Sequence, residues 1–564
     1  MRFNRFLNPG ARIEGSVRPN GRQFALALVA LALALVGCAG EDDATTQTFP
    51  IVEGFLGGVV ADEPRAALVG RDVLASGGNA ADAATAVYFS LSVTLPSSAS
   101  LGGGGVCVVH DAITETVEAL EFLPGAPKGG PSGASRPTAI PGNPRGFFAL
   151  HSRYGSVRWS QILAGAENLA RFGTPVSRAL AFDLAKVGTA LAADSAARRV
   201  FTRESKTRPG SVQMLAEGDF ITQFELANVL ARLRALGPGD FYAGQFTRTI
   251  VAAVADAGGK LEVDDLRGYV PKWRPTLAIE FGNDLAHFSP PPAAAGVVAA
   301  QVSTMLTRDD DYEDATDGER AHLLAEAFLR AFADRETWLD TNAESEPAAA
   351  SALVSEERIA RLWQTVQRDR HVPASTLRPA PVRRLENPAA TTFVTVDRYG
   401  SAVACALTMN NLFGTGRIAP GTGILLAMAP DDRGRGPESL GPMIVMNRHN
   451  GSFRFAAAAS GGAVAPTAMM NVALGALVEN RSLEDAIAAK RLHHGGDPDL
   501  VYYEPGFDPE RLNAMTARGH HIAPTETLGR VNAAYCPNGL PPNSASCSFR
   551  ADPRGVGLAV GADQ

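Results

Sequence analysis

The sequence predicts an α+β protein in which antiparallel strand pairs pack with long helices. Residues 391–409 contain two apolar segments with β-branched side chains at alternating positions, and a short turn joins them. A second strand pair spans residues 443–460. Helical patterns occupy residues 79–95 and 319–339. The chain has 564 residues, of which 45% are hydrophobic and 20% charged, and this is an ordinary globular composition.

The hairpin 391–409 turns at Asp397–Gly400 and is followed by a glycine-rich loop at 413–423. Two threonines, Thr391 and Thr392, stand where its first strand begins. Threonine is common in strands, so the pair alone indicates only a strand. A threonine hydroxyl becomes a nucleophile when the chain is cut just before it, because the freed α-amino group then acts as its base.

The two helices differ in character. The segment 79–95 is small and apolar nearly all round, which predicts a buried helix with Asn79 as its N-cap. The segment 319–339 has one apolar stripe and is amphipathic. His322 and Glu326 lie one turn apart on it, but no third ligand is near in sequence, so we expect a solvated or structural pair and no metal.

The N-terminus is typical of an export signal. Five arginines precede an apolar run at 24–37, which is short for a membrane span and fits a signal peptide. The run ends directly at Cys38, in a pattern that resembles a bacterial lipobox. We expect a lipoprotein anchored through Cys38, with residues 38–50 as a polar tether, in the periplasm or on a membrane face of a bacterium. A soluble secreted protein is the alternative.

Charge argues against one class of partner. The chain carries −7, and residues 1–37 contain five Arg and one Glu, so the chain without them carries −11. A chain this acidic is not expected to bind nucleic acid.

The four further cysteines are predicted to be two buried thiols and one disulfide-bonded pair. Cys107 and Cys405 lie in apolar, strand-like segments and are expected to be buried thiols. Cys536 and Cys547 bracket a short loop, and a disulfide between them suits an exported protein. A metal pair is the weaker alternative there, since no neighbouring His or Asp supports it.

Several motifs resemble the γ-glutamyltranspeptidase family. The longest is TVDRYGSAVACALTMNNLFGTG followed by PGTGILL, and GGNAADAA followed by LGGGG is the second. The resemblance covers about residues 52–564. It implies a four-layer αββα N-terminal-nucleophile (Ntn) hydrolase fold and self-cleavage into a large-subunit region, 51–390, and a small-subunit region, 391–564. The family transfers a γ-glutamyl group from glutathione to water or an amino acid through an acyl-threonine.

The resemblance also assigns site residues. It implies that Thr408 hydrogen-bonds the nucleophile, that Gly461 and Gly462 hold the oxyanion, and that three residues contact the substrate. These are Asn410, Asp432, which would bind an amino group, and Ser439, which would lie near the α-carboxylate. Backbone N–H groups at a Gly-Gly helix start suit an oxyanion.

The nucleophile position itself leaves two alternatives. Family members have threonine seven residues before the turn aspartate, and counting back from Asp397 gives Ala390, with Thr391 one place later. A one-residue shift in a strand turns a side chain to the opposite face. Either a bulge at the strand start brings Thr391 into place, or Ala390 occupies the position and the chain neither cleaves itself nor catalyses.

Substrate recognition is altered as well. Leu123 stands where the family has the arginine that pairs with the α-carboxylate, and leucine cannot replace a bidentate, charge-assisted contact. Glu438 replaces one of the family's two serines, and Ala429 replaces its glutamine. A less polar acyl group than γ-glutamyl, as in the related cephalosporin acylases, would suit this pocket better.

These patterns favour an exported Ntn amidohydrolase that cleaves itself before Thr391, and two alternatives remain. One is a catalytically inactive, unprocessed binding or structural lipoprotein, and the other is an acylase with non-glutamyl specificity. No metal or organic cofactor is implied. The expected partners are a small peptide or amide substrate, a membrane reached only through the lipid anchor, and the two subunits for each other.

Overall fold

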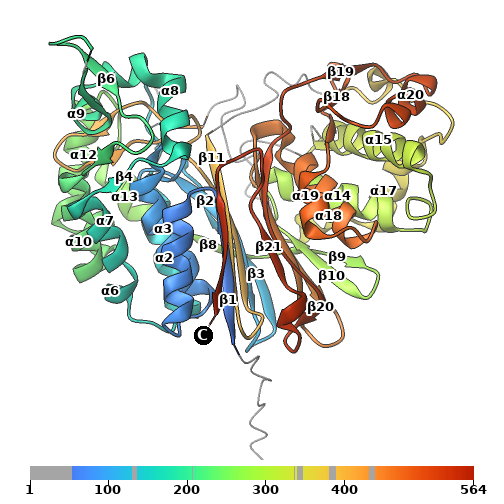
Figure 1. Ribbon diagram of the computed structural model, residues 1–564, viewed down its shortest axis with the longest axis horizontal. Coiled ribbons are helices and arrows are strands. Elements are labelled where there is room, and N and C mark those ends of the chain that lie inside the picture. Colours follow the sequence, from blue (N-terminus) through green and yellow to red (C-terminus); the bar gives the residue numbers. More distant parts are fainter. Residues whose placement is uncertain are drawn as a thin grey trace, which may run out of the picture. The chain divides into compact units, whose positions relative to one another are not determined.

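Two antiparallel sheets, one of seven strands and one of six, form the centre of the fold (Figure 1). They belong to a unit that begins at Pro50. In this computed structural model the described residues are 54–129, 136–205, 207–335, 337–338, 347–379, 389–430 and 439–563. The predicted lipobox cysteine Cys38, the tether 38–50, and the site residues Asp432 and Glu438 lie outside them.

The seven-stranded sheet contains the predicted hairpin. Its order is β22 (Leu558–Asp563), β1 (Phe55–Ala61), β11 (Ala390–Asp397), β12 (Ala402–Thr408), β2 (Gly104–Asp111), β3 (Thr116–Phe122) and β8 (Lys272–Pro275). The hairpin is confirmed, and its register runs without a shift from Ala390 opposite Thr408 to Val396 opposite Ala402.

The six-stranded sheet contains the second predicted strand pair. Its order is β21 (Ser548–Arg550), β20 (Arg530–Leu540), β16 (Phe453–Ser460), β15 (Met443–Asn447), β10 (Asp284–Phe288) and β9 (Leu277–Phe281). Short two- and three-stranded sheets are formed by β4 (Thr174–Pro175) with β7 (Phe220–Ile221), β5 (Thr202–Glu204) with β6 (Val212–Met214), β13 (Ile418–Ala419) with β14 (Ile424–Leu425), and β17 (Leu492–His494) with β18 (Val501–Tyr503) and β19 (Ile522–Pro524).

Helices from the first half of the chain cover the outer face of the seven-stranded sheet (Figure 1). They are α2 (Pro64–Ala75), α3 (Ala80–Thr94), α4 (Pro96–Ala99), α5 (Asn143–Tyr154), α6 (Trp159–Ile162), α7 (Ala164–Phe172), α8 (Arg178–Ala192), α9 (Ser195–Phe201), α10 (Phe224–Leu236), α11 (Gly239–Tyr242), α12 (Gln245–Asp256) and α13 (Val263–Gly268). The predicted N-cap is confirmed: the Asn79 side chain accepts from Asp82 N, and every residue of α3 is buried.

A second helix layer covers the outer face of the six-stranded sheet. It contains α14 (Ala294–Thr307), α15 (Asp317–Arg335), α16 (Pro347–Ala352), α17 (Glu356–Trp363), α18 (Ala465–Leu477), α19 (Leu483–Ala488) and α20 (Pro509–Ala517). Helix α15 is the predicted amphipathic helix, two residues earlier at its start than expected. The helix predicted directly after Gly461–Gly462 begins as a 3₁₀ turn, Gly462–Val464, and α18 follows it.

The four layers therefore run helix, sheet, sheet, helix, which confirms the predicted αββα arrangement. Side chains between the sheets form their own apolar core, to which Val394 and Val396 of β11 contribute together with Ile444 and Ala456 of the second sheet. Among the described helices, none combines the length and apolarity needed to cross a bilayer.

Candidate functional site

Ala390 lies at the start of β11 and faces the space between the two sheets. Strand side chains alternate, and Val394 and Val396 of the same strand belong to the core between the sheets. Ala390 is 5% exposed and packs with Val106 and Ala406 from neighbouring strands and with Ala293 and Leu440 from outside the sheet. The position that the family resemblance assigns to the nucleophile thus holds a methyl group in an apolar surround.

Thr391 faces the opposite way, toward the first helix layer. Phe393 and Thr395 share its face: Phe393 is part of the helix-side core, and Thr395 donates to the Ala80 carbonyl in α3. The Thr391 hydroxyl donates a 2.9 Å hydrogen bond to Asp62, which follows β1. Since the register of β11 with β12 has no shift, the bulge that would turn Thr391 into the space between the sheets is absent. Its role as nucleophile stays a prediction, and the strand geometry gives it no support.

Two side chains, those of Asp62 and of Asn532 in β20, fix the start of β11 by hydrogen bonds. One carboxylate oxygen of Asp62 accepts from the Thr391 hydroxyl and from the Thr392 amide at 3.0 Å. The other accepts from the Asn532 side chain at 2.9 Å, and that same amide reaches the Thr392 carbonyl and hydroxyl oxygens. Asp62 and Asn532 are not among the residues that the sequence predicts for the site. The available signal was a carboxylate placed directly after a strand without polar residues.

The resemblance implied that Thr408 hydrogen-bonds the nucleophile, and in the structure the Thr408 hydroxyl bonds a backbone carbonyl instead. Thr408 pairs with Ala390 across the hairpin, and its hydroxyl donates a 3.2 Å hydrogen bond to the carbonyl of Ala389. The Met409 amide donates to the same carbonyl at 3.2 Å. Two donors therefore polarise the carbonyl that precedes Ala390, as a self-cleaving bond requires.

Asn410 follows Thr408 in a left-handed conformation with φ of 58°. Its side-chain nitrogen, Nδ2, donates hydrogen bonds to the carbonyls of Met428 at 2.9 Å and Pro124 at 3.3 Å, and these bonds hold the side chain in place. Its side-chain oxygen is buried and has no partner among the described residues. An orphaned acceptor here is available to an amine or amide N–H of a ligand.

Gly461 and Gly462 lie where β16 of the second sheet ends, across from β11. Gly461 has φ of 138°, and a Cβ there would meet the Gly529 backbone at 2.8 Å, so no other residue fits without strain. Gly462 opens the 3₁₀ turn, so its N–H has no partner within that turn. Both glycines have a positive φ, 138° for Gly461 and 72° for Gly462, and their role in holding an oxyanion stays a prediction.

The remaining predicted pocket residues are apolar or partly exposed. Leu123 packs against the Ala390 cluster, and its carbonyl accepts from the Tyr269 hydroxyl at 3.0 Å. Ala429 is buried and bonds Pro137 through its amide. Ser439 is half-buried and directly precedes Leu440 of the cluster. The structure thus brings Leu123, Ala390 and Leu440 together in one apolar cluster.

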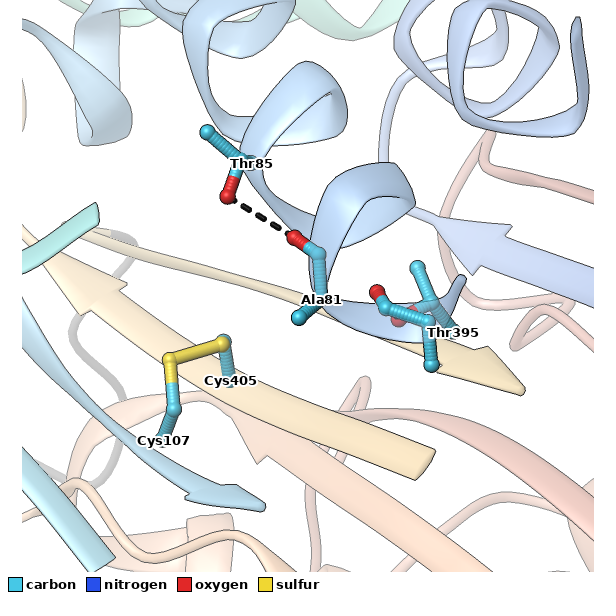
Figure 2. Close-up of a disulfide and its surroundings, with 6 residues drawn as sticks. Ala81, Thr85, Cys107, Thr395 and Cys405 are labelled. Carbon is cyan, nitrogen blue, oxygen red and sulfur yellow. Dashed lines mark hydrogen bonds between the residues drawn. A yellow bond between two sulfur atoms is a disulfide. The ribbon is translucent and has the colours of Figure 1, made fainter. Parts of the chain in front are cut away.

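One cysteine prediction is confirmed and one is wrong. Cys536 and Cys547 form a disulfide, as expected. Cys107 and Cys405, expected as free thiols, form a second disulfide, because β2 and β12 are neighbours and their register places the two residues directly opposite (Figure 2). The bond lies on the helix-facing side of the sheet, in the same core as Ala81 of α3.

The expectation for His322 and Glu326 also needs correction. Both side chains are fully buried, and His520, far away in sequence, lies 2.7 Å from His322 between ring nitrogens. A third potential ligand is therefore near after all, because the fold brings α20 against α15.

Comparison with known proteins identifies the family. A family model described as gamma-glutamyltranspeptidase matches residues 66–562. The chain is 28% identical over 526 residues to the glutathione hydrolase proenzyme of Escherichia coli, covering 86% of this chain and 89% of that protein. It is 27% identical over 516 residues to scoloptoxin SSD14 of Scolopendra dehaani, covering 84% and 87%.

Solved structures show the same fold. Cephalosporin acylase from Bacillus halodurans superposes with a TM-score of 0.73 at 22% identity, covering 92% of this chain and 99% of that one. Helicobacter pylori gamma-glutamyltranspeptidase superposes with a TM-score of 0.53 at 28% identity, covering 58% and 97%. Curated relatives carry the names of enzymes, the glutathione hydrolases. This chain belongs to the gamma-glutamyltranspeptidase family of enzymes and has its Ntn-hydrolase fold.

Proposed function

We propose that this chain is a family member that stays uncut, forms no acyl-threonine, and binds a small amide or peptide ligand. The single observation that carries the proposal is the place of Ala390, whose methyl group faces the space between the sheets opposite Thr408. An alanine has no oxygen to attack the preceding carbonyl or a substrate. Without that oxygen neither self-cleavage nor an acyl-enzyme can form at this position.

The ligand that suits the pocket is less polar than a γ-glutamyl group. Leu123 replaces a guanidinium, and Leu440 and Val106 add apolar surface beside Ala390. A substrate α-carboxylate would lose its charge-assisted partner and be desolvated here, which is unfavourable. The unpartnered oxygen of Asn410 supports an amine or amide N–H on the ligand.

A second candidate is the Ntn amidohydrolase that uses Thr391 after cleavage between Ala390 and Thr391. The observation that favours it is the 2.9 Å hydrogen bond from the Thr391 hydroxyl to Asp62, since a carboxylate is a possible base for that hydroxyl. In that case the large- and small-subunit regions would associate after the cut, and the acyl donor would be glutathione-like or a less polar amide. This candidate requires Thr391 to leave the helix-facing side of the strand.

Two assays separate the candidates. Purified protein without its leader is incubated with γ-glutamyl-p-nitroanilide, with glutathione and with an acylated cephalosporin, and amine release is followed. The proposal expects no turnover, and it expects thermal stabilisation by an N-acyl amide with an apolar acyl group, lost in Leu123→Glu. Turnover that disappears in Thr391→Ala would instead establish the amidohydrolase.

For localisation, we propose export and a lipid anchor at Cys38, supported by the apolar run that ends at that residue. The mass of the mature N-terminal peptide from a bacterial host tests this. A diacylglyceryl-modified Cys38, absent in Cys38→Ser, supports the anchor, and an unmodified peptide starting elsewhere contradicts it.

A further inference from the structure

A second cluster of chemically active side chains lies in the outer helix layer of the six-stranded sheet. It consists of two groups, each with three potential ligand atoms within 4.8 Å of one another: His322 and Glu326 of α15 with His520 after α20, and His371 after α17 with His494 of β17 and Asp499 between β17 and β18. The contact between His371 Nδ1 and Glu326 Oε1, at 2.6 Å, joins the two groups. None of these residues takes part in the site around Ala390.

His322 is fixed in one tautomer by its surroundings. Its Nε2 lies 2.7 Å from the carbonyl oxygen of Gln367, which only accepts, so Nε2 carries the proton. Its Nδ1 therefore presents a lone pair to the interior of the cluster. Such a hydrogen bond from the outer ring nitrogen to a carbonyl is the usual support of a metal-binding histidine.

His371 is oriented in the same manner. Its Nε2 lies 3.1 Å from a carboxylate oxygen of Asp499, and its Nδ1 lies 2.6 Å from Oε1 of Glu326. Asp499 is itself held by the Ala374 amide at 2.8 Å and by His494 at 3.1 Å. A carboxylate behind a histidine raises the basicity of the inner nitrogen and fixes the ring.

Glu326 and His520 each direct one side-chain atom at the ring nitrogens of the other histidines. The second oxygen of Glu326 pairs with Arg330, which leaves Oε1 directed at His371 and, at 3.8 Å, at Nε2 of His520. His520 Nε2 also lies 2.7 Å from His322 Nδ1. The other ring nitrogen of His520 is buried and has no partner among the described residues.

We propose that His322 Nδ1, His371 Nδ1, His520 Nε2 and Glu326 Oε1 bind one divalent cation of the zinc type. Three imidazoles and one carboxylate are ligands that Zn²⁺ prefers, whereas Mg²⁺ and Ca²⁺ prefer oxygen alone. The outer contacts that orient metal ligands are present for three of the four, through Gln367, Asp499 and Arg330.

Binding exchanges protons for the metal. Without metal, the contacts of 2.6 and 2.7 Å between ligand atoms each hold one proton, on His371 Nδ1 and on His520 Nε2. When Zn²⁺ binds, the proton on His371 Nδ1 leaves to solvent, and the proton on His520 Nε2 moves to the Nδ1 of the same ring, because a neutral imidazole keeps one N–H. The two close pairs of ligand atoms then separate to about 3.3 Å, as zinc–ligand bonds of about 2.0–2.1 Å in a tetrahedral site require. Asp499 is 31% exposed and marks the side from which the ion enters.

A metal ion bound here would connect segments of the chain on both sides of Ala390. His322, Glu326 and His371 precede Ala390 in sequence, and Asp499 and His520 follow it. A bound ion would tie the two regions that family members separate into subunits, whether or not this chain is cut. The inference is therefore independent of the proposed function.

The test uses leader-free full chain purified without a metal-affinity tag, with zinc chloride as the probe. After incubation and gel filtration, metal analysis is expected to give one zinc per chain, and zinc is expected to raise the melting temperature reversibly with a chelator. Cobalt substitution is expected to give the visible absorption of a tetrahedral site. Asp499→Asn, which leaves all four ligands, is expected to weaken zinc binding about 10- to 100-fold.

His520→Ala and His371→Ala are expected to lose stoichiometric zinc. The matched control is His449→Ala, which removes an exposed histidine on the β15–β16 turn and is expected to bind as the parent does. If one of the cluster variants fails to fold, the cobalt spectrum of the unmodified protein still decides. Absence of retained zinc in the parent, or retention in a folded His520→Ala, overturns the proposal.

Discussion

The hydroxyl of Thr408 donates a 3.2 Å hydrogen bond to the carbonyl oxygen of Ala389, the residue immediately before Ala390. The Met409 amide donates to the same oxygen. In a self-cleaving chain, these donors would stabilise the negative charge that develops when a hydroxyl at position 390 attacks this carbonyl. This chain has two donors on the Ala389 carbonyl, and the side chain at position 390 has no oxygen that could attack it.

The first prediction is that Ala390→Thr restores self-cleavage. The new hydroxyl would attack the Ala389 carbonyl carbon, the amide bond between residues 389 and 390 would break to give an ester and a free amine, and water would hydrolyse the ester. Mass spectrometry during incubation is expected to show two fragments, the smaller beginning at position 390. The parent protein is expected to remain whole.

Two controls accompany this variant. Ala390→Val adds similar volume without a hydroxyl, so it is expected to stay uncut and to report the cost of filling a site that is 5% exposed, about 1–3 kcal/mol. Adding Thr408→Val to Ala390→Thr is expected to slow cleavage at least tenfold by removing one donor. A folded Ala390→Thr protein that never cleaves would contradict the geometry proposed for this carbonyl.

The second prediction concerns Leu123. In the Ala390→Thr background, Leu123→Arg supplies a guanidinium beside the Ala390 cluster and is expected to lower KM for glutathione at least tenfold, because it can pair with the α-carboxylate in bidentate fashion. Leu123→Lys adds the same charge but lacks the planar pair of donors of a guanidinium, so it is expected to lower KM less. Equal KM values for all three proteins would place the carboxylate elsewhere.

The third prediction concerns the disulfides. Cys107–Cys405 closes a sequence separation of 298 residues and Cys536–Cys547 one of 11. The loop-entropy argument gives about 6 kcal/mol for the long loop and about 3 kcal/mol for the short one. Denaturant unfolding is therefore expected to show the larger loss of stability in the double variant Cys107→Ala/Cys405→Ala. Alkylation without reductant is expected to label neither pair, and labelling of Cys107 would refute the bond.

The fourth prediction is a pH dependence of stability from two buried histidines. Burial lowers the pKa of His110 on β2 and of His287 on β10 from 6.5 to about 4. Between pH 6.5 and 4 the unfolded chain binds these protons and the native chain does not, so stability is present above pH 6.5 and is lost as the pH falls toward 4. Each histidine accounts for about 3 kcal/mol of this loss.

The pH prediction is measured as the difference between variants. Free energies of unfolding for His110→Asn and His287→Asn, taken from pH 7.5 to 4.5, are expected to fall less steeply with acidification than those of the parent. His449→Asn alters an exposed histidine and is expected to reproduce the slope of the parent. Parallel slopes for all four proteins would contradict the lowered pKa values.

The sequence alone predicts those elements that depend on residues close together along the chain. The hairpin around Asp397–Gly400 follows from residue alternation and turn chemistry, and the start of α3 follows from Asn79 as a cap. The family motifs then supplied the layer arrangement. Counting back from Asp397 gives Ala390 at the nucleophile position, but only the register of β11 against β12 shows that no bulge compensates for it.

The rest depends on contacts that no local pattern encodes. The Cys107–Cys405 bond needs β2 and β12 to be neighbours in a given register, and the apolar strand sequences gave no sign of either. His520 and His371 reach Glu326 only because segments after α17 and α20 return to α15. Spacing along the sequence indicates only His322 and Glu326, which lie one turn apart on the same helix.

The most direct test of the central claim is the intact mass and N-terminal sequence of leader-free protein after long incubation. The account predicts one uncut chain with Ala390 inside it, since the residue at the nucleophile position has no hydroxyl. Two fragments, the smaller beginning at Thr391, would contradict the account and would establish Thr391 as the nucleophile of an active Ntn hydrolase.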